Sequence, residues 1–558
     1  MKRLLLVVFV LSISCIYNVL HTTNNSSSTK GVSTAVDVPA DVSSWMDSKL
    51  RKAKRKNVLT NEQFFTRDSA KLVGYIKGYQ PSLGFRTMTV NAGNLLTREE
   101  RPLTFEIDAS GKFSCTFPMI HPRKVTLSFD KELLSVYVEP GQVLAICFDW
   151  NVIKKNNGFK IANNPSDILY LKGPLAKLNY ELLSFKLKSI GYRHYSIRTS
   201  HQPEQYLAEM DSILRLNETL VKQAEKDGII SSKAIAIQKN EALLQHGFYL
   251  IDYAITKNEE GVQLPANYYN SLQKLPLNDP TTIVSGIYGA FINRFEENPV
   301  TMKRFKNVGK YNSMGDFYMK VQNNRDSLLK TDLKLSTSFN YDVTKIRRLA
   351  VDIKKLGKNE AYAYYAKIAS GIQHPFLKQE GLRILKSQFG TENTLATDRG
   401  VSTPALPDKP LQQWVPLSLP ANKEAELFSK LIAPYKGKYL FVDFWGTSCG
   451  PCRWGIEDKK SVRDNYKNNP KFEFVFITCN TWSPDMAAYE KYVAQQGLVN
   501  SHYVSNDDFN YFQQLFRFTG VPHYLFIDPN GKVLDLDFEM FVGFERARQW
   551  IEDKKTEK

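Results

Sequence analysis

The stretch KYLFVDFWGTSCGPCRWGIED, residues 438–458, decides the fold of the C-terminal part of this chain. Its apolar run at 439–444 predicts a buried strand, which ends in a turn at 446–448. A helix is then expected to begin at Cys449-Gly450-Pro451-Cys452. We therefore expect one thiol at the carboxyl end of a strand and a second one within bonding distance, in the first turn of the following helix.

The expected position of these cysteines predicts redox chemistry. Unpaired backbone N–H groups and the positive end of the helix dipole favour a thiolate, and such surroundings lower thiol pKa values to roughly 3.5–7.5. Cys449, expected to be exposed, is therefore the candidate nucleophile. Cys452 is the candidate resolving thiol, because it is close enough to attack a mixed disulfide and release the partner. The alternatives are half a zinc site or a chance pair, but the sequence has no second CxxC and no His-x3-5-His, so no metal site is predicted.

The segment from Asp443 to Cys452 resembles the active-site segment of thioredoxin-fold thiol-disulfide oxidoreductases. A second match is Thr519-Gly520-Val521-Pro522, where that family carries a cis-proline facing the active site. The resemblance implies that Asp443 accepts the proton of the resolving thiol, that Cys449 and Cys452 form a redox-active disulfide, and that no cofactor is used. It also implies a set of residues that contact the substrate. These are Trp445, Gly450, Pro451 and Val521.

The unit between the two matched segments resembles the insertion of membrane-tethered, periplasm-facing thioredoxin-like reductases, the TlpA/ResA-like group related to AhpC/TSA proteins. It contains a buried strand from Phe472 and a helix that is expected to take Ser483 as its N-cap and to end before Gly497. The chain departs from the family beside Pro522, where His523 is unusual. We expect His523 to be an ordinary exposed histidine, with modulation of Cys449 as the alternative.

The N-terminus predicts export. Met1-Lys2-Arg3 and the apolar run at 4–13 are typical of a signal peptide. Cys15 follows a segment that resembles a loose bacterial lipobox, so Cys15 is the predicted lipidation site. Ordinary cleavage further along, or retention of 4–20 as a short signal anchor, are the alternatives. The expected location is the bacterial cell envelope, facing the periplasm, with a lipid anchor in the membrane.

The chain is predicted to be multidomain, with an N-terminal all-β sandwich or barrel, a central α-helical domain and a C-terminal α/β thioredoxin fold. Short strands with alternating apolar residues support the N-terminal β-domain. This domain resembles the β-domain that precedes thioredoxin modules in many Bacteroidetes envelope proteins. Apolar residues at helical spacing support the central α-helical domain. The predicted boundaries are 1–21 for the signal peptide and lipobox, 22–65 for a flexible tether, 66–152 for the β-domain, 165–390 for the helical domain, 391–414 for a linker and 415–558 for the thioredoxin-like domain.

Several residues outside the CxxC segment are assigned to packing. Cys115 and Cys147 lie inside predicted strands, so buried free thiols are expected, with a disulfide between them as the alternative. The aromatic residues of the helical domain are expected to pack in its core, with a ligand groove as the alternative. They are Tyr249, Tyr253, Tyr288, Phe291, Tyr362, Tyr364 and Tyr365.

The formal net charge of +17 is unevenly distributed. Residues 421–558 carry 18 Lys and Arg against 19 Asp and Glu, so the excess lies before residue 421. Such basicity either favours anionic membranes or forms a generally solvated surface, which is the simpler interpretation. No run of basic residues interleaved with aromatics suggests nucleic acid as a partner.

These features predict an envelope thiol-disulfide oxidoreductase that reduces exported proteins. Gly450-Pro451 is the dipeptide of reducing thioredoxins, and Asp443 suits proton removal from Cys452. The expected partners are disulfide-containing envelope proteins and an inner-membrane electron donor, because the oxidising envelope has no thiol buffer. A disulfide isomerase or oxidase is one alternative. The other is a binding or scaffold protein whose β and helical domains capture a partner, with the CxxC accessory.

Overall fold

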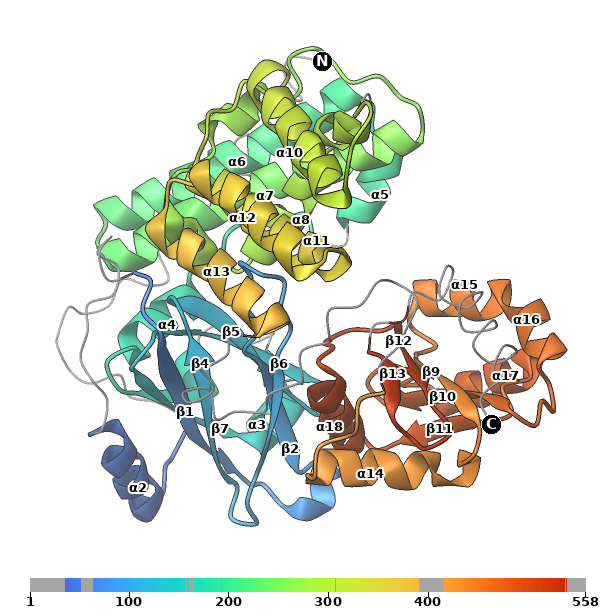
Figure 1. The fold of residues 1–558 in the computed structure, drawn as a ribbon. Helices are drawn as coiled ribbons and strands as arrows, with labels where there is room; N and C mark the ends of the chain where they lie inside the picture. The colour runs from blue at the N-terminus through green and yellow to red at the C-terminus, as the bar shows by residue number, and fades with distance from the viewer. Residues whose placement is uncertain are drawn as a thin grey trace.

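The computed structural model describes residues 36–51, 64–156, 158–159, 165–191, 193–306, 308–390, 416–536 and 538 (Figure 1). The predicted signal peptide, the Cys15 lipidation site, the linker at 391–414 and most of the tether lie outside these residues. Within the described ranges, no helix has the length and apolar character needed to cross a membrane.

The N-terminal β region consists of two four-stranded sheets packed face to face. The first has the strand order β4-β1-β7-β8 and the second β3-β2-β5-β6. Their facing side chains form one core cluster, to which Leu72 and Ile146 contribute from the first sheet and Leu127 and Val136 from the second. The strands are β1 (Asp68–Lys77), β2 (Thr87–Asn91), β3 (Pro102–Glu106), β4 (Lys112–Met119), β5 (Arg123–Phe129), β6 (Glu132–Val138), β7 (Val143–Asp149) and β8 (Leu169–Lys172).

Three helices flank this region: α2 (Ala40–Leu50), α3 (Trp150–Lys155) and α4 (Ala176–Ser184). Helix α2 covers the outer face of the first sheet, where Met46 packs with Val73 and Cys147. Cys115 and Cys147 are free and buried, which confirms the expectation that they do not pair.

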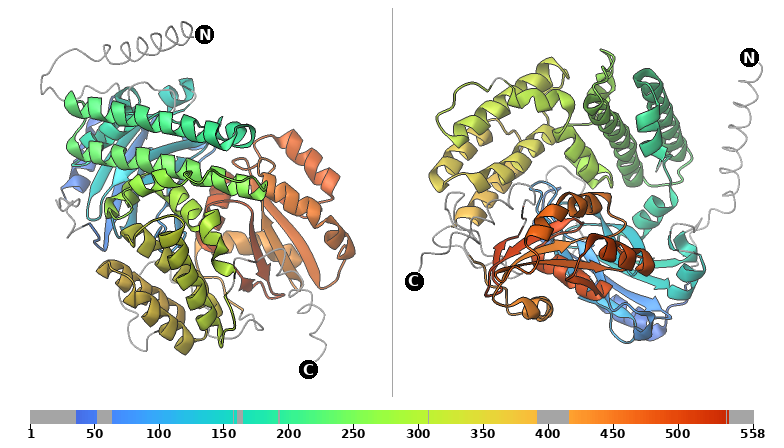
Figure 2. Two further views of the ribbon diagram at one scale, coloured as in Figure 1. Left: turned by 90° about the horizontal axis from the view of Figure 1, so that it is seen from above. Right: turned by 90° about the vertical axis from the view of Figure 1, so that its right-hand side faces the viewer.

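The central region is helical, and its long helices α6 and α7 run side by side (Figure 2). Its aromatic residues pack in the core: Tyr253, Tyr288 and Phe291 are fully buried, as expected from the sequence. The helices are α5 (Arg193–Ser200), α6 (Pro203–Lys226), α7 (Ser232–Glu259), α8 (Tyr288–Glu296), α9 (Pro299–Met302), α10 (Met314–Thr331), α11 (Phe339–Asp352), α12 (Lys358–Ser370) and α13 (Pro375–Phe389), with 3-10 turns between them such as η6 (Lys303–Phe305).

The C-terminal region is built on a five-stranded sheet with the order β11-β10-β9-β12-β13. Strands β9, β10 and β11 are parallel, and β12 is antiparallel to both β9 and β13. Every residue of the central strand β9 is buried, because helices cover both faces of the sheet. The elements are α14 (Lys423–Ile432), β9 (Tyr439–Phe444), α15 (Gly450–Asp458), α16 (Lys460–Asn465), β10 (Phe472–Cys479), α17 (Met486–Gln496), β11 (Ser501–Val504), α18 (Asn506–Phe516), β12 (His523–Ile527) and β13 (Val533–Asp535).

The start of α17 differs from the sequence-based expectation. Asp485, not Ser483, is its N-cap and accepts a hydrogen bond from the Ala488 N–H. The Ser483 hydroxyl is used elsewhere: it accepts the Thr447 N–H at 3.0 Å and pairs with the Thr478 hydroxyl at 2.9 Å. A tertiary hydrogen bond therefore displaces the cap that local sequence favoured.

Helix α18 joins the C-terminal region to the second sheet of the β region (Figure 1). Asp507, in the first turn of α18, accepts the Thr87 N–H at 3.0 Å, the Thr87 hydroxyl at 2.6 Å and the Arg86 N–H at 3.0 Å. On the edge strand β3, the Thr104 hydroxyl donates to the Asn510 carbonyl at 2.9 Å. A helix from the far end of the chain therefore packs against the edge strand β3 of this sheet.

Candidate active site

Cys449 and Cys452 form a disulfide at the N-terminus of α15. Cys449 is the N-cap, and its sulfur accepts the N–H of Cys452 at 3.1 Å. Cys449 is 8% exposed and Cys452 is 0% exposed. The expectation of an exposed Cys449 is therefore corrected to a nearly buried one, because the neighbouring segments close over the disulfide. Even so, Cys449 is the residue of the pair that an outside sulfur reaches.

The segment before β12 lies directly against this pair. The carbonyl oxygen of Val521 is 3.6 Å from Cys449 Sγ, and the Val521–Pro522 peptide bond is cis. Val521 and Pro522 are half-buried, whereas Gly450 and Pro451 are exposed. These four residues therefore form the rim around Cys449, where a bound disulfide substrate would lie.

Trp445 takes a different role from the one the resemblance implied. Its side chain is fully buried, with its ring 5.5 Å from that of Tyr492 and 5.9 Å from that of Tyr489, both on α17. The aromatic side chains of the insertion enclose it. In this structure Trp445 supports the loop before Cys449 and offers no surface to a substrate.

Asp443 is fully buried, and neither carboxylate oxygen has a hydrogen-bond partner within the part of the chain described. Because side chains alternate along a strand, Asp443 shares a face of β9 with Phe441, which packs in the cluster that contains Cys452. Burial raises the pKa of Asp443 well above its ordinary value, and the positive charge of Arg463 opposes that rise only in part. A carboxyl group of this kind keeps its proton to a higher pH than an exposed aspartate does.

Arg463 is a site residue that the sequence analysis missed. It lies on α16, and its guanidinium donates to the carbonyl oxygens of Ile456 and, at 3.3 Å, of Gln496. These bonds hold the end of α15 and the end of α17 together around one buried cation. No local motif marks this arginine, because its role depends on contacts between three helices.

The loop between β9 and α15 is fixed by the segment that follows β10. The Ser448 N–H and hydroxyl both donate to the Trp482 carbonyl, at 3.2 and 2.7 Å. Gly446 faces the same residue so closely that an added Cβ would lie 2.4 Å from the Trp482 carbonyl oxygen. Only glycine fits there, and this close approach sets the position of the residues leading to Cys449.

His523 corrects a second expectation, since it is 9% exposed rather than an open surface residue. Its ring stacks on Phe518 at 4.3 Å between centroids, on the side of the sheet covered by α14 and α18. The first residue of β12 is therefore a packing residue. Nearby, the Thr519 hydroxyl donates to Glu100 at 2.7 Å and connects the segment before Pro522 to the β region.

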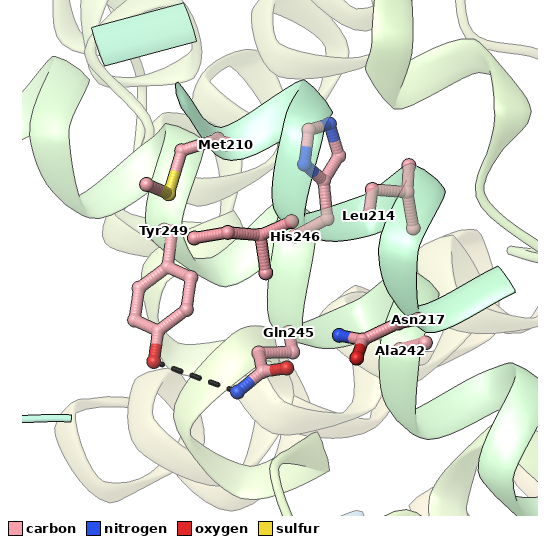
Figure 3. A pocket seen from close by; sticks show the side chains of 8 residues that line it. Met210, Leu214, Asn217, Ala242, Gln245, His246 and Tyr249 are labelled. Atoms are coloured by element: carbon pink, nitrogen blue, oxygen red, sulfur yellow. Dashed lines mark hydrogen bonds between the residues drawn. The ribbon is translucent and has the colours of Figure 1, made fainter. Parts of the chain in front are cut away.

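The helical region contains a small cavity between α6 and α7 (Figure 3). Its volume of about 10 Å³ is room for roughly one water molecule, too little for an organic ligand. His246 lines it, and burial lowers the pKa of that imidazole. Within the described ranges no three His, Cys, Asp or Glu side chains gather as metal ligands would.

Residues 437–533 match the family model described as thioredoxin-like. A solved thiol:disulfide interchange protein of the thioredoxin family from Chlorobium tepidum is 28% identical over 18% of this chain and 70% of that chain, with a TM-score of 0.17. A solved thiol-disulfide oxidoreductase from Bacteroides fragilis is 20% identical over 20% of this chain and 83% of that chain, also with a TM-score of 0.17. The family match and the bonded cysteine pair make the C-terminal region a thioredoxin-like domain and the chain an oxidoreductase.

Proposed function

We propose that this chain reduces disulfide bonds in exported proteins of the bacterial cell envelope. The observation that carries the proposal is the asymmetry of the pair: Cys449 keeps a little exposed surface at a helix N-terminus, whereas Cys452 is fully buried. One sulfur is therefore placed to meet a substrate and the other to finish the reaction. Asp443 is buried on the face of β9 that packs with the cluster containing Cys452. It supplies an acceptor for the proton that Cys452 loses when it resolves the mixed disulfide.

The proposed reaction starts from the reduced dithiol. The Cys449 thiolate attacks one sulfur of the substrate disulfide, forms a mixed disulfide and releases the first substrate thiolate. Cys452 then gives its proton to Asp443, and its thiolate attacks Cys449 Sγ. This attack forms the Cys449–Cys452 disulfide and releases the second substrate thiolate. The two electrons that reduce the substrate come from the two cysteines of the pair.

The reductive direction requires a donor that returns the pair to its dithiol form. In an oxidising envelope that donor is proposed to be an inner-membrane protein that carries electrons from the cytoplasm. Membership of the TlpA/ResA-like group, a lipid anchor at Cys15 and disulfide-containing envelope proteins as substrates belong to the same proposal. Gly450-Pro451, the dipeptide of reducing thioredoxins, favours this direction over oxidation or isomerisation.

Trapping of covalent complexes tests the proposal. Cys452→Ser keeps the first attack and removes the resolving thiol, so mixed disulfides should accumulate in the envelope and disappear on adding reductant. Cys449→Ser should trap none, because Cys452 is buried. Cys479→Ser is a matched control, since that cysteine is a buried free thiol outside the pair, and it should leave trapping unchanged. Mass spectrometry of the trapped species identifies the substrates.

The outcomes separate the proposal from its rivals. Trapping by Cys449→Ser alone would reverse the roles of the two thiols. If neither variant traps a protein during growth, and if the purified chain fails to reduce a model disulfide, a binding role for the β and helical regions replaces the reductase. A measured reduction potential decides direction, because a strongly oxidising value would make the pair an oxidase or isomerase.

A further inference from the structure

One end of the helical region carries an exposed apolar surface. Ten large apolar side chains are exposed among the described residues, and four of them lie between the last residue of α9 and the first residue of α10, inclusive. They are Met302 at 42%, Phe305 at 41%, Tyr311 at 51% and Met314 at 39% exposure. We refer to these four residues, together with Lys303, Lys306 and Lys310, as the 302–314 patch.

The charge of the 302–314 patch is entirely positive. Its three lysines are exposed, and no Asp or Glu occurs between residues 302 and 314. The ion pairs on either side, Arg294 with Glu297 and Lys320 with Asp316, do not include them. The patch therefore combines exposed apolar side chains with three lysines that form no ion pair with these neighbouring carboxylates.

The 302–314 patch is held in place by the rest of the helical region. Asn324 on α10 donates to the Arg304 carbonyl at 3.1 Å, and the Tyr311 ring lies 5.0 Å from that of Phe317. The buried Arg304 guanidinium sits 4.5 Å from the Phe305 ring centre and adds to the positive potential behind it. Exposure of these apolar groups is thus a property of the folded protein. In Figure 1, helix α10, which begins at Met314, lies at the end of the molecule opposite α2 and α14.

We propose that the 302–314 patch binds an anionic membrane surface. Aromatic and methionine side chains favour the boundary between headgroups and acyl chains, and lysines beside them are attracted to anionic headgroups. The Met, Phe and Tyr side chains would also suit a protein partner, but lysine is depleted in protein–protein interfaces and this patch has three lysines beside four apolar side chains. The contact is independent of any lipid on Cys15. It would hold the end of the helical region against the bilayer and leave the opposite end of the molecule facing away.

Vesicle binding by the full-length chain tests this inference, with Cys15→Ala in every sample so that no lipid anchor contributes. The probes are vesicles of phosphatidylethanolamine with phosphatidylglycerol, and vesicles of phosphatidylcholine alone. Combined Lys303→Gln, Lys306→Gln and Lys310→Gln should weaken binding to the anionic vesicles about a hundredfold, as expected for three lysines near such a surface. Combined Phe305→Ser and Tyr311→Ser should weaken it about tenfold.

A matched control removes the same charge elsewhere. Lys222, Lys226 and Lys436 are exposed, and changing all three to Gln should leave binding within about threefold of the parent. Hydrogen exchange adds a readout without substitution: vesicles should protect amides within 302–314 in the parent chain. Equal losses in both lysine sets, equal binding to phosphatidylcholine, or no added protection would each overturn the inference. Capture of an envelope protein at the patch without binding to vesicles would replace the membrane with a protein partner.

Discussion

Asp443 lies directly opposite Tyr524 in the register between the antiparallel strands β9 and β12. Burial raises the pKa of Tyr524, and the negative charge of Asp443 raises it further. The tyrosine therefore remains neutral beside the carboxyl group. Among the described residues, the positive charge of Arg463 is what favours ionisation of Asp443. Burial therefore makes Asp443 a proton acceptor that is available only above a raised pKa.

The pH dependence of turnover should change when Asp443 loses its charge. Below the raised pKa of Asp443 the group already holds a proton, so the rate of the parent protein should rise as pH increases through that pKa. Asp443→Asn should lack this rise. At pH values above that pKa it should turn over about a hundredfold more slowly than the parent, the usual scale for losing a general base. Rates of model-disulfide reduction across pH provide the measurement. Superimposable profiles would remove Asp443 from the mechanism.

Asp443→Asn should increase the free energy of unfolding, although it slows turnover. Because the folded pKa of Asp443 is raised, the native state binds more protons than the unfolded state above about pH 4, the unfolded pKa. The stability contribution is full below that pH and is lost as pH rises through the folded pKa. Asp443→Asn should therefore raise the free energy of unfolding, and the gain should grow with pH. Urea denaturation at acidic and neutral pH measures it, and a gain independent of pH would contradict the assignment.

Gly446→Ala should destabilise the active-site loop. The added Cβ would lie 2.4 Å from a backbone oxygen of Trp482, which has little freedom to move. We expect a loss of about 1–3 kcal/mol in the free energy of unfolding, the usual cost of overpacking. Gly450→Ala is the matched control, since an added Cβ there meets nothing within 4 Å. Equal stability of the two variants would show that the loop before Cys449 adapts freely.

Asp507→Ala should weaken the attachment of the C-terminal region to the β region. It leaves the Arg86 and Thr87 N–H groups and the Thr87 hydroxyl without their acceptor. The expected loss is about 1–3 kcal/mol, measured by denaturant unfolding of the full chain. Asp508→Ala changes the neighbouring acidic residue in the same helical turn and serves as the control. If both variants lose the same stability, the effect belongs to the helix terminus and not to the interface.

Cys15, which lies outside the described residues, gives the test of anchoring. Metabolic labelling with a fatty acid should tag the parent protein, and Cys15→Ala should abolish the tag. The same substitution should release the protein from the membrane fraction in part, because the 302–314 patch is proposed as a second contact. A label that survives the substitution would refute lipidation at Cys15.

Local signals in the sequence determined the chemistry of this protein. The apolar run at 439–444, the turn after it and the spacing of Cys449 and Cys452 predicted a strand and a helix that meet at a dithiol, and β9 and α15 have that arrangement. Such predictions succeed because strand burial, helix initiation and a short loop closure depend on neighbours along the chain. The strand β11 and helix α18 received no prediction, because the short edge strand at 501–504 has no strong apolar alternation.

Only the tertiary structure decided how the dithiol is surrounded. The burial of Trp445 and His523, the charge of Arg463 acting on Asp443 and the exposed 302–314 patch all depend on which surfaces meet after folding. The clearest case is Asp507, whose partners lie 420 and 421 positions away in the sequence. Burial and hydrogen bonding between such distant residues are set by the packing of whole elements, so no local pattern encodes them.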